Sequence, residues 1–144
     1  MVNQGLRDQL VSAYGGSVVD TRVLFTGLTP ERELQSLIDN AFFAIILYDK
    51  SSLNNYYCDA NRLYQSVARR VPVIVGSNPG LADYVSRYDF GLVLTDDGQD
   101  LCSLTEAVRR MGEASFSGFD ESQFKRAAEC LSWERNEKIF EGLV

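Results

Sequence analysis

The residues of this chain that could carry chemistry lie in four short polar segments, each directly after an apolar run. These segments are Thr26–Gly27, Asp49–Ser52, Gly76–Gly80 and Asp96–Asp97. They offer carboxylates, hydroxyls, one lysine and open backbone, which are groups that bind the hydroxyls and phosphates of a small polar ligand. Histidine is absent from the chain. A reaction that needs an imidazole base would therefore have to take it from another domain or chain.

The elements that position these segments alternate between strand and helix patterns. Strands are expected at 22–27, 42–48, 72–76 and 91–95, and helices at 4–14, 29–40, 59–69 and 81–87. This alternation predicts an α/β fold, namely a three-layer α/β/α, Rossmann-like, doubly wound parallel sheet of about four strands. Because the run from 42 to 48 is apolar without alternation, we expect it to be the central strand. Ligands bind at the carboxyl ends of the strands in such sheets, where the four segments lie.

The last third of the chain is expected to be helical. Leu101, Leu104, Val108 and Met111 form one apolar stripe, and Asp120 with Gln123 forms a capping box that begins a further helix. The stretch 113–118 is expected to be a loop, and Asp96-Asp97-Gly98 a turn and helix cap rather than a metal loop. We expect residues 1–144 to form a single domain.

The helix expected at 59–69 has a polar stripe beside its apolar face. Leu63, Tyr64, Val67 and Ala68 form the predicted buried face, and the flanking stripe consists of Cys58, Asn61 and Gln65. The N-terminus of this helix would offer unpaired N–H groups to a pyrophosphate. The competing interpretation is structural, since residues at a helix start are often caps and a polar flank is often only solvated.

Composition excludes several classes of function. The net charge is −6, with 20 acidic and 14 basic residues, and such a chain repels nucleic-acid backbones. No apolar run reaches the roughly 20 residues that a membrane span requires, so no transmembrane segment is expected. Cys58, Cys102 and Cys130 are widely spaced and are expected to be reduced, which favours a cytoplasmic location.

Residues 61–74, NRLYQSVARRVPVI, resemble the pattern N-K-L-F-E-Y-x-A-x-G-x-P-V-I of the nucleotide-sugar half of GT-B glycosyltransferases of the group 1 or family 4 type. Two further segments are similar to that family. The run VLFTG, with ELQSLI in the helix after it, resembles its V-x-F-x-G segment. The sequence LSWE at 131–134 resembles its W-E ending.

The resemblance implies a C-terminal donor-binding domain of a hexosyltransferase that acts on a polysaccharide or glycolipid. It implies a separate N-terminal acceptor domain, which is absent here, and a nucleotide-diphosphate sugar as substrate, with no cofactor or metal. The donor-binding residues that we assign are Gly27, Asp49, Lys50, Ser51, Cys58, Asn61, Arg62, Leu63 and Gln65. No catalytic residue is assigned. The parent enzyme would be cytoplasmic and peripheral to the inner face of the membrane.

The chain departs from the family pattern at several positions. The glutamate that contacts ribose falls on Gln65, the lysine on Arg62, the glycine on Arg70, and the earlier glutamate of the E-x7-E motif on Tyr57. The basic pair for the diphosphate and two strands of the family sheet are also lacking. These departures support the alternative of a non-catalytic nucleotide-binding or interaction module, from a split or degenerate transferase.

We expect the chain to be a C-terminal piece of a longer enzyme. Such a piece would be inactive by itself, and its open strand edges would favour a homodimer or strand exchange. A nucleotide-sugar epimerase fits less well, because the acidic and histidine groups which that fold uses are not found.

Overall fold

The computed structural model describes residues 4–113, 118–132 and 137. These residues group into two compact units, 1–37 and 38–144, and each is described by itself.

The first unit begins with two short helices joined at a glycine. Helix α1 spans Gln4–Tyr14, as the sequence predicted, and α2 spans Gly16–Arg22. Gly15 between them has φ +86°, a conformation that glycine adopts without a steric penalty. An ion pair of 2.7 Å between Arg7 and Asp20 connects the two helices. Among the side chains that the structure describes in this unit, only that of Val19 is buried.

The prediction of a strand at 22–27 is wrong. Arg22 ends α2, and the residues after it are extended but belong to no sheet. Leu24 and Leu28 are 79% and 93% exposed. The β-branched and aromatic residues favour extended backbone locally, but a strand also needs a neighbour to pair with, and this segment has none among the described residues.

Helix α3, Glu31–Asp39, confirms the helix expected at 29–40, although it begins one residue after Pro30. Leu34, Leu37 and Ile38 have the spacing of one apolar face, but no residue of this helix is buried.

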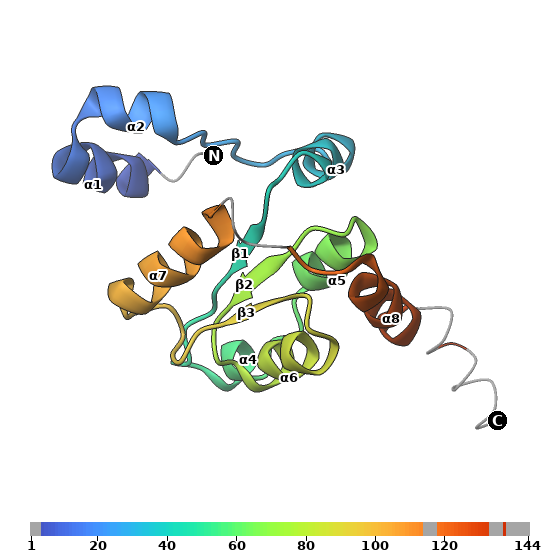
Figure 1. Ribbon diagram of the computed structural model, residues 1–144. Coiled ribbons are helices and arrows are strands. Elements are labelled where there is room, and N and C mark those ends of the chain that lie inside the picture. Colours follow the sequence, from blue (N-terminus) through green and yellow to red (C-terminus); the bar gives the residue numbers. More distant parts are fainter. Residues whose placement is uncertain (1–3, 114–117, 133–136, 138–144) are drawn as a thin grey trace. The chain divides into compact units, whose positions relative to one another are not determined.

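Three of the four predicted strands form a parallel sheet in the second unit. The strands are β1, Ala44–Ile46; β2, Val73–Val75; and β3, Gly91–Val93, in the order β1-β2-β3. Ala44 lies opposite Val73, and Val73 lies opposite Gly91. Helix α5, Asn61–Ala68, connects β1 to β2, and α6, Pro79–Tyr88, connects β2 to β3 (Figure 1). The α/β class with a parallel sheet is therefore confirmed.

The central strand of this sheet is β2, so the prediction that 42–48 is central is wrong. Val73, Ile74 and Val75 have no exposed surface, whereas Ile45 of β1 is 43% exposed. The reason is the missing strand. Because residues 22–27 add nothing to the sheet, β1 pairs on one side only among the described residues.

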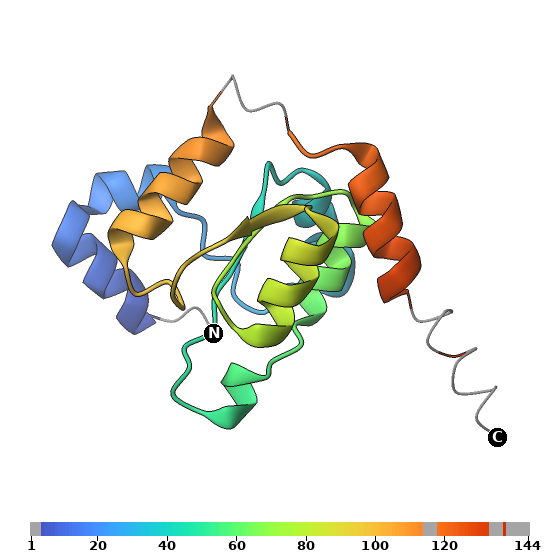
Figure 2. The same ribbon diagram turned by 60° about the horizontal axis from the view of Figure 1, so that its bottom comes forward.

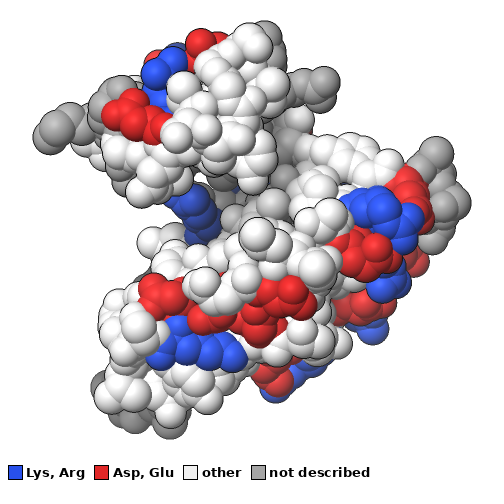
Figure 3. Space-filling model, turned by 90° about the vertical axis from the view of Figure 1, so that its left-hand side faces the viewer, with Lys and Arg blue, Asp and Glu red and all other residues white. Residues whose placement is uncertain are grey.

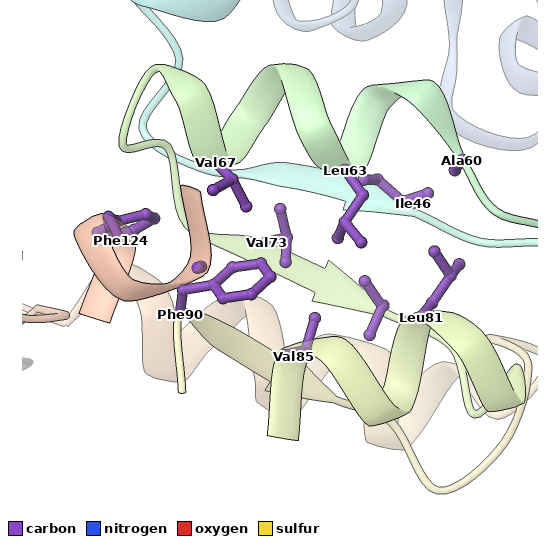
Figure 4. Packing of buried hydrophobic residues seen from close by; sticks show 11 residues of the cluster. Ile46, Ala60, Leu63, Val67, Val73, Leu81, Val85, Phe90 and Phe124 are labelled. Carbon is purple, nitrogen blue, oxygen red and sulfur yellow. The ribbon is translucent and has the colours of Figure 1, made fainter. Parts of the chain in front are cut away.

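Apolar side chains cover both faces of the sheet. On one face, Val73 and Val75 pack with residues of α5, α6 and α8, Glu121–Leu131, including Leu63, Leu81 and Phe124 (Figure 4). On the other face, Ile74 packs with Ala107 and Met111 of α7, Leu101–Gly112. Figure 1 shows α7 on the opposite side of the sheet from α5 and α6. Alternate residues of β2 therefore contribute to two separate cores.

The helices after β3 follow the sequence prediction. In the predicted stripe of α7, Met111 is buried and Leu104 and Val108 are half-buried, but Leu101 is 69% exposed. Helix α8 begins at the predicted capping box: the Asp120 carboxylate accepts from the backbone, and Gln123 Oε1 accepts from the Asp120 N–H at 2.5 Å. The WE pair at 133–134 and most of the loop expected at 113–118 lie outside the described residues. The short helix α4, Leu53–Tyr56, was not predicted.

The buried face of α5 differs partly from the prediction. Leu63 and Val67 are buried as expected, but the third buried residue is Ser66, and Ala68 is exposed. The N–H of Val71 donates to the Ser66 carbonyl at 2.9 Å, so the chain turns back toward Ser66 as it enters β2. Among the helices that the structure describes, none has the length and apolar character that crossing a bilayer requires.

Candidate functional site

The loops after the three strands meet at the carboxyl edge of the sheet. Lys50 Nζ, after β1, donates to Ser77 Oγ, after β2, at 2.6 Å. The Lys50 N–H donates to Asp97 Oδ2, after β3, at 3.2 Å. The Ser77 N–H donates to the carbonyl of Asp96 at 2.7 Å. We call Asp49, Lys50, Ser77, Asp96 and Asp97 the carboxyl-edge cluster.

Asp49 binds groups of its own loop. Its carboxylate accepts the Ser51 N–H at 2.9 Å, the Ser51 hydroxyl, and Asn55 Nδ2 at 2.9 Å. The hydrogen bond from the Ser51 hydroxyl is the main cause that lowers the pKa of Asp49 below its usual value. Asp49 is therefore a poor general base at neutral pH, and the Ser51 hydroxyl is already engaged as a donor. Asp49 and Ser51, two of the predicted donor-binding residues, therefore lie together, and their hydrogen bonds fix the conformation of their own loop.

Asp96 has a similar role after β3. Its carboxylate accepts the N–H of Gly98 at 3.1 Å and of Asp100 at 2.6 Å, and the bond from Asp100 is the main cause that lowers its pKa. Gly98 has φ +95°, and Asp100 is the N-cap of α7. The chain bends at 95–98, as the predicted turn requires, but the N-cap of α7 is Asp100, so the helix cap predicted at Asp96-Asp97-Gly98 is wrong. Within the described residues, no group of three or more histidine, cysteine or acidic side chains is arranged to hold a metal ion.

Lys50 is the basic residue of the cluster. The Nζ atom keeps two further N–H donors after its bond to Ser77, and the residue is exposed. A phosphate or a hydroxyl group that reached this edge could accept from Nζ. The short helix α4 lies at the same edge, which Figure 2 turns toward the viewer.

Ser77 and Asn78 belong to the polar segment Gly76–Gly80 that the sequence singles out, but they are not among the predicted donor-binding residues. A signal was available, because both follow directly on the most buried strand, at the edge where ligands bind in parallel sheets. Nothing in the local pattern separated them from an ordinary turn.

The predicted residues near the start of α5 form a second group. Asn61 and Arg62 are exposed, Gln65 is half-buried, and the N-cap residue Ala60 makes no side-chain capping bond. Cys58 is half-buried and interacts with Tyr48; burial is the main cause that raises the pKa of Tyr48, and Arg62 opposes it. Tyr48 adjoins Asp49, so this group lies near the cluster, although no described hydrogen bond or ion pair joins the two.

The other two predicted residues are placed differently. Leu63 has no exposed surface and packs in the core, so its side chain cannot reach a ligand. Gly27 belongs to the first unit, where it has φ +64° and its carbonyl accepts from Thr29 Oγ1 at 3.5 Å.

Two cavities are lined by residues outside the cluster. A cavity of about 440 Å³ in the first unit is lined by the end of the extended segment and by α3, including Leu24, Thr26 and Leu37. A cavity of about 320 Å³ lies by the amino ends of β1 and β2 and is lined by Phe42, Arg70, Pro72, Met111, Gly118, Phe119 and Phe124. Neither cavity is lined by the residues that come directly after β1, β2 or β3.

Acidic and basic side chains are interspersed on the surface. On the face shown in Figure 3, basic side chains lie beside acidic ones. On α7, for example, Arg109 pairs with both Glu106 and Glu113. Comparison of the chain with protein-family models, with curated proteins and with solved structures found no match.

Proposed function

We propose that residues 38–144 bind a nucleotide-diphosphate sugar at the carboxyl edge of the sheet, as the donor-binding part of a cytoplasmic hexosyltransferase. The observation that supports this proposal is the hydrogen bond from Lys50 Nζ to Ser77 Oγ at the edge where three parallel strands end. We propose further that the sheet is Rossmann-like. The resemblance of residues 61–74 to GT-B donor domains also supports the proposal.

The groups at this edge fit the two parts of such a ligand. Lys50 supplies the positive charge for a diphosphate oxygen, and the start of α5, which no side chain caps, offers backbone N–H groups. Asp97 and Gln65 can accept hydrogen bonds from ribose or sugar hydroxyls.

The same edge lacks a good base. The pKa values of Asp49 and Asp96 are lowered by hydrogen bonds from their own loops, so neither carboxylate takes up a proton readily at neutral pH. We therefore assign donor binding to this chain, and assign activation of the acceptor hydroxyl to a separate acceptor domain.

Calorimetric titration of the full chain with uridine and guanosine diphosphates and their hexose conjugates tests the proposal. We expect saturable binding of one nucleotide series and, for Lys50→Ala, a loss of about tenfold or more in affinity, since one charge-assisted hydrogen bond is removed. Lys125→Ala, an exposed lysine of α8, is the matched control and should bind as the wild type does. No heat from any of these nucleotides with a folded chain would refute donor binding.

The alternative is a nucleotide-binding or interaction module without transferase activity. The acidic character of the edge favours it, because the cluster holds three aspartates, Asp49, Asp96 and Asp97, and one lysine, Lys50. Negative charge near Lys50 weakens its attraction for a diphosphate. Slow release of nucleoside diphosphate from the bound donor, with or without an acceptor domain supplied in trans, distinguishes the two. Binding with no release in either case favours the non-catalytic module.

A further inference from the structure

Asn78 occupies an unusual position at the start of α6. It is the N-cap residue of this helix and has no exposed surface, yet its side chain caps nothing. Asn78 Nδ2 instead donates to the carbonyl of Asn55, at α4, at 2.9 Å. The side chain of an N-cap asparagine ordinarily accepts a hydrogen bond from an N–H group of the first helical turn. The side chain of Asn78 instead donates to a residue outside its own helix.

That contact connects two loops of the carboxyl edge. Asn55, which accepts from Asn78, uses its own Nδ2 to donate to Asp49 at 2.9 Å. Ser77, the neighbour of Asn78 in the chain, accepts from Lys50 Nζ at 2.6 Å. The segment 49–55 is therefore held at its far end by Asn78 and near its beginning by Ser77.

Gly76 gives Asn78 the space it occupies. A Cβ atom on Gly76 would lie 3.0 Å from Asn78 Oδ1 and 3.2 Å from Asp97 Cα. A Cβ atom here would require the Asn78 amide or the loop after β3 to shift by a few tenths of an ångström. Glycine at this position therefore permits the close approach of these loops.

One of the two polar atoms of Asn78 makes no hydrogen bond. Asn78 Oδ1 is buried without a hydrogen-bond partner, and such a group destabilises a fold. An apolar side chain of the same shape would avoid that cost. What the apolar side chain could not do is hold the Asn55 carbonyl.

We propose that Asn78 is a positioning residue of the carboxyl edge: by holding Asn55 it fixes the segment 49–55 and keeps Lys50 Nζ on Ser77. The importance of this for a donor rests on the proposed function. The placement of Lys50 itself can be measured with no ligand present.

Competitive labelling of the intact chain with limiting acetic anhydride, read by mass spectrometry, measures the reactivity of Lys50 relative to the exposed Lys125. Asn78→Leu keeps the branched shape of the side chain, with a larger volume, and removes both of its polar atoms, and Asn78→Ala is a second, smaller variant. In both we expect the Lys50-to-Lys125 labelling ratio to rise about two- to tenfold, as the loss of one hydrogen bond would give. Ser77→Ala, which removes the acceptor itself, sets the upper limit of the effect.

Val85→Ala is the control for a loss of stability alone, because Val85 is a fully buried residue of the same helix that packs in the core. Its labelling ratio should equal that of the wild type. An unchanged ratio in both Asn78 variants overturns the proposal, as does an equal rise in Val85→Ala. Failure of the wild type to bind any nucleotide would instead refute the proposed function, and the labelling ratios would still decide the role of Asn78.

Discussion

Arg70 stands where the glycosyltransferase pattern has glycine, and its backbone shows why glycine suits this position. Its φ is +58°, in the left-handed region, just after α5. Its side chain pairs with Glu121 at 2.8 Å, but both side chains are exposed, so the ion pair contributes little. The chain therefore keeps a strained arginine at a turn that a glycine would relax.

Arg70→Gly is expected to stabilise the fold. In a Glu121→Gln background, where the ion pair is already absent, the substitution should raise the free energy of unfolding by about 0.5–1 kcal/mol, since glycine adopts this conformation without a Cβ clash. Urea denaturation of the two chains measures the difference. A lower denaturation midpoint for the glycine variant would show that Arg70 makes a contribution beyond its ion pair.

The carboxylate of Asp96 gives the fold a dependence on pH. Because backbone hydrogen bonds lower its pKa in the folded state, its contribution is complete above the pKa of the unfolded chain and is lost as the pH falls through the folded-state pKa. Asp96→Asn removes this titration. We expect the stability of the variant to fall less steeply than that of the wild type between about pH 5 and about pH 3. Urea midpoints across this range are the measurement, and parallel slopes would contradict the assignment.

At the scale of elements, the pairing of β2 with β3 depends on a glycine. Gly91 lies opposite Val73, and a Cβ atom on Gly91 would come within 2.3 Å of the Val73 carbonyl oxygen. Because the clash is with backbone, no side-chain rotation can relieve it. Two adjacent strands can approach here only because one of them carries no side chain.

Gly91→Ala should therefore lower the free energy of unfolding by at least about 2 kcal/mol. Gly112→Ala is the matched control: Gly112 is the last residue of α7, and nothing lies within 4 Å of its Cβ position. There the added methyl group should leave stability unchanged or raise it by up to about 1 kcal/mol, because alanine is the better helix former. Similar effects of the two substitutions would show that β2 and β3 are not packed as described.

At the scale of the whole molecule, the two compact units differ in how much they bury. Both apolar core clusters belong to residues 38–144. The first unit exposes several large apolar side chains, notably Leu24 and Leu28 in its extended segment. Stability is expected to be lower where few apolar contacts form.

Among the leucine sites of the chain, limited proteolysis with chymotrypsin should cut first after Leu24 or Leu28. Leu63 and Leu81 offer the same cleavage chemistry but have no exposed surface, so these sites should survive until the second unit unfolds. Mass spectrometry of the early fragments identifies the order. Early cleavage at Leu63 or Leu81 would contradict the separate stability of residues 38–144.

The sequence by itself determined the elements whose signals are local. The apolar period of α7, the capping box of α8 and the bounds of α1 each depend on residues within a few positions of one another, and all three were predicted. The strand-helix alternation gave the parallel sheet, and the rule for such sheets directed attention to Asp49, Lys50 and Ser51.

Only the tertiary structure decided which strand is central and which polar groups meet. The extended run at 22–27 has strand-like residues but no partner, which leaves β1 at an edge; pairing between distant segments carries no local signature. The same holds for the carboxyl edge. Lys50 and Ser77 are 27 residues apart in sequence, and Asn78 meets Asn55 across 23, so their hydrogen bonds exist only because parallel strands bring successive loops to one edge.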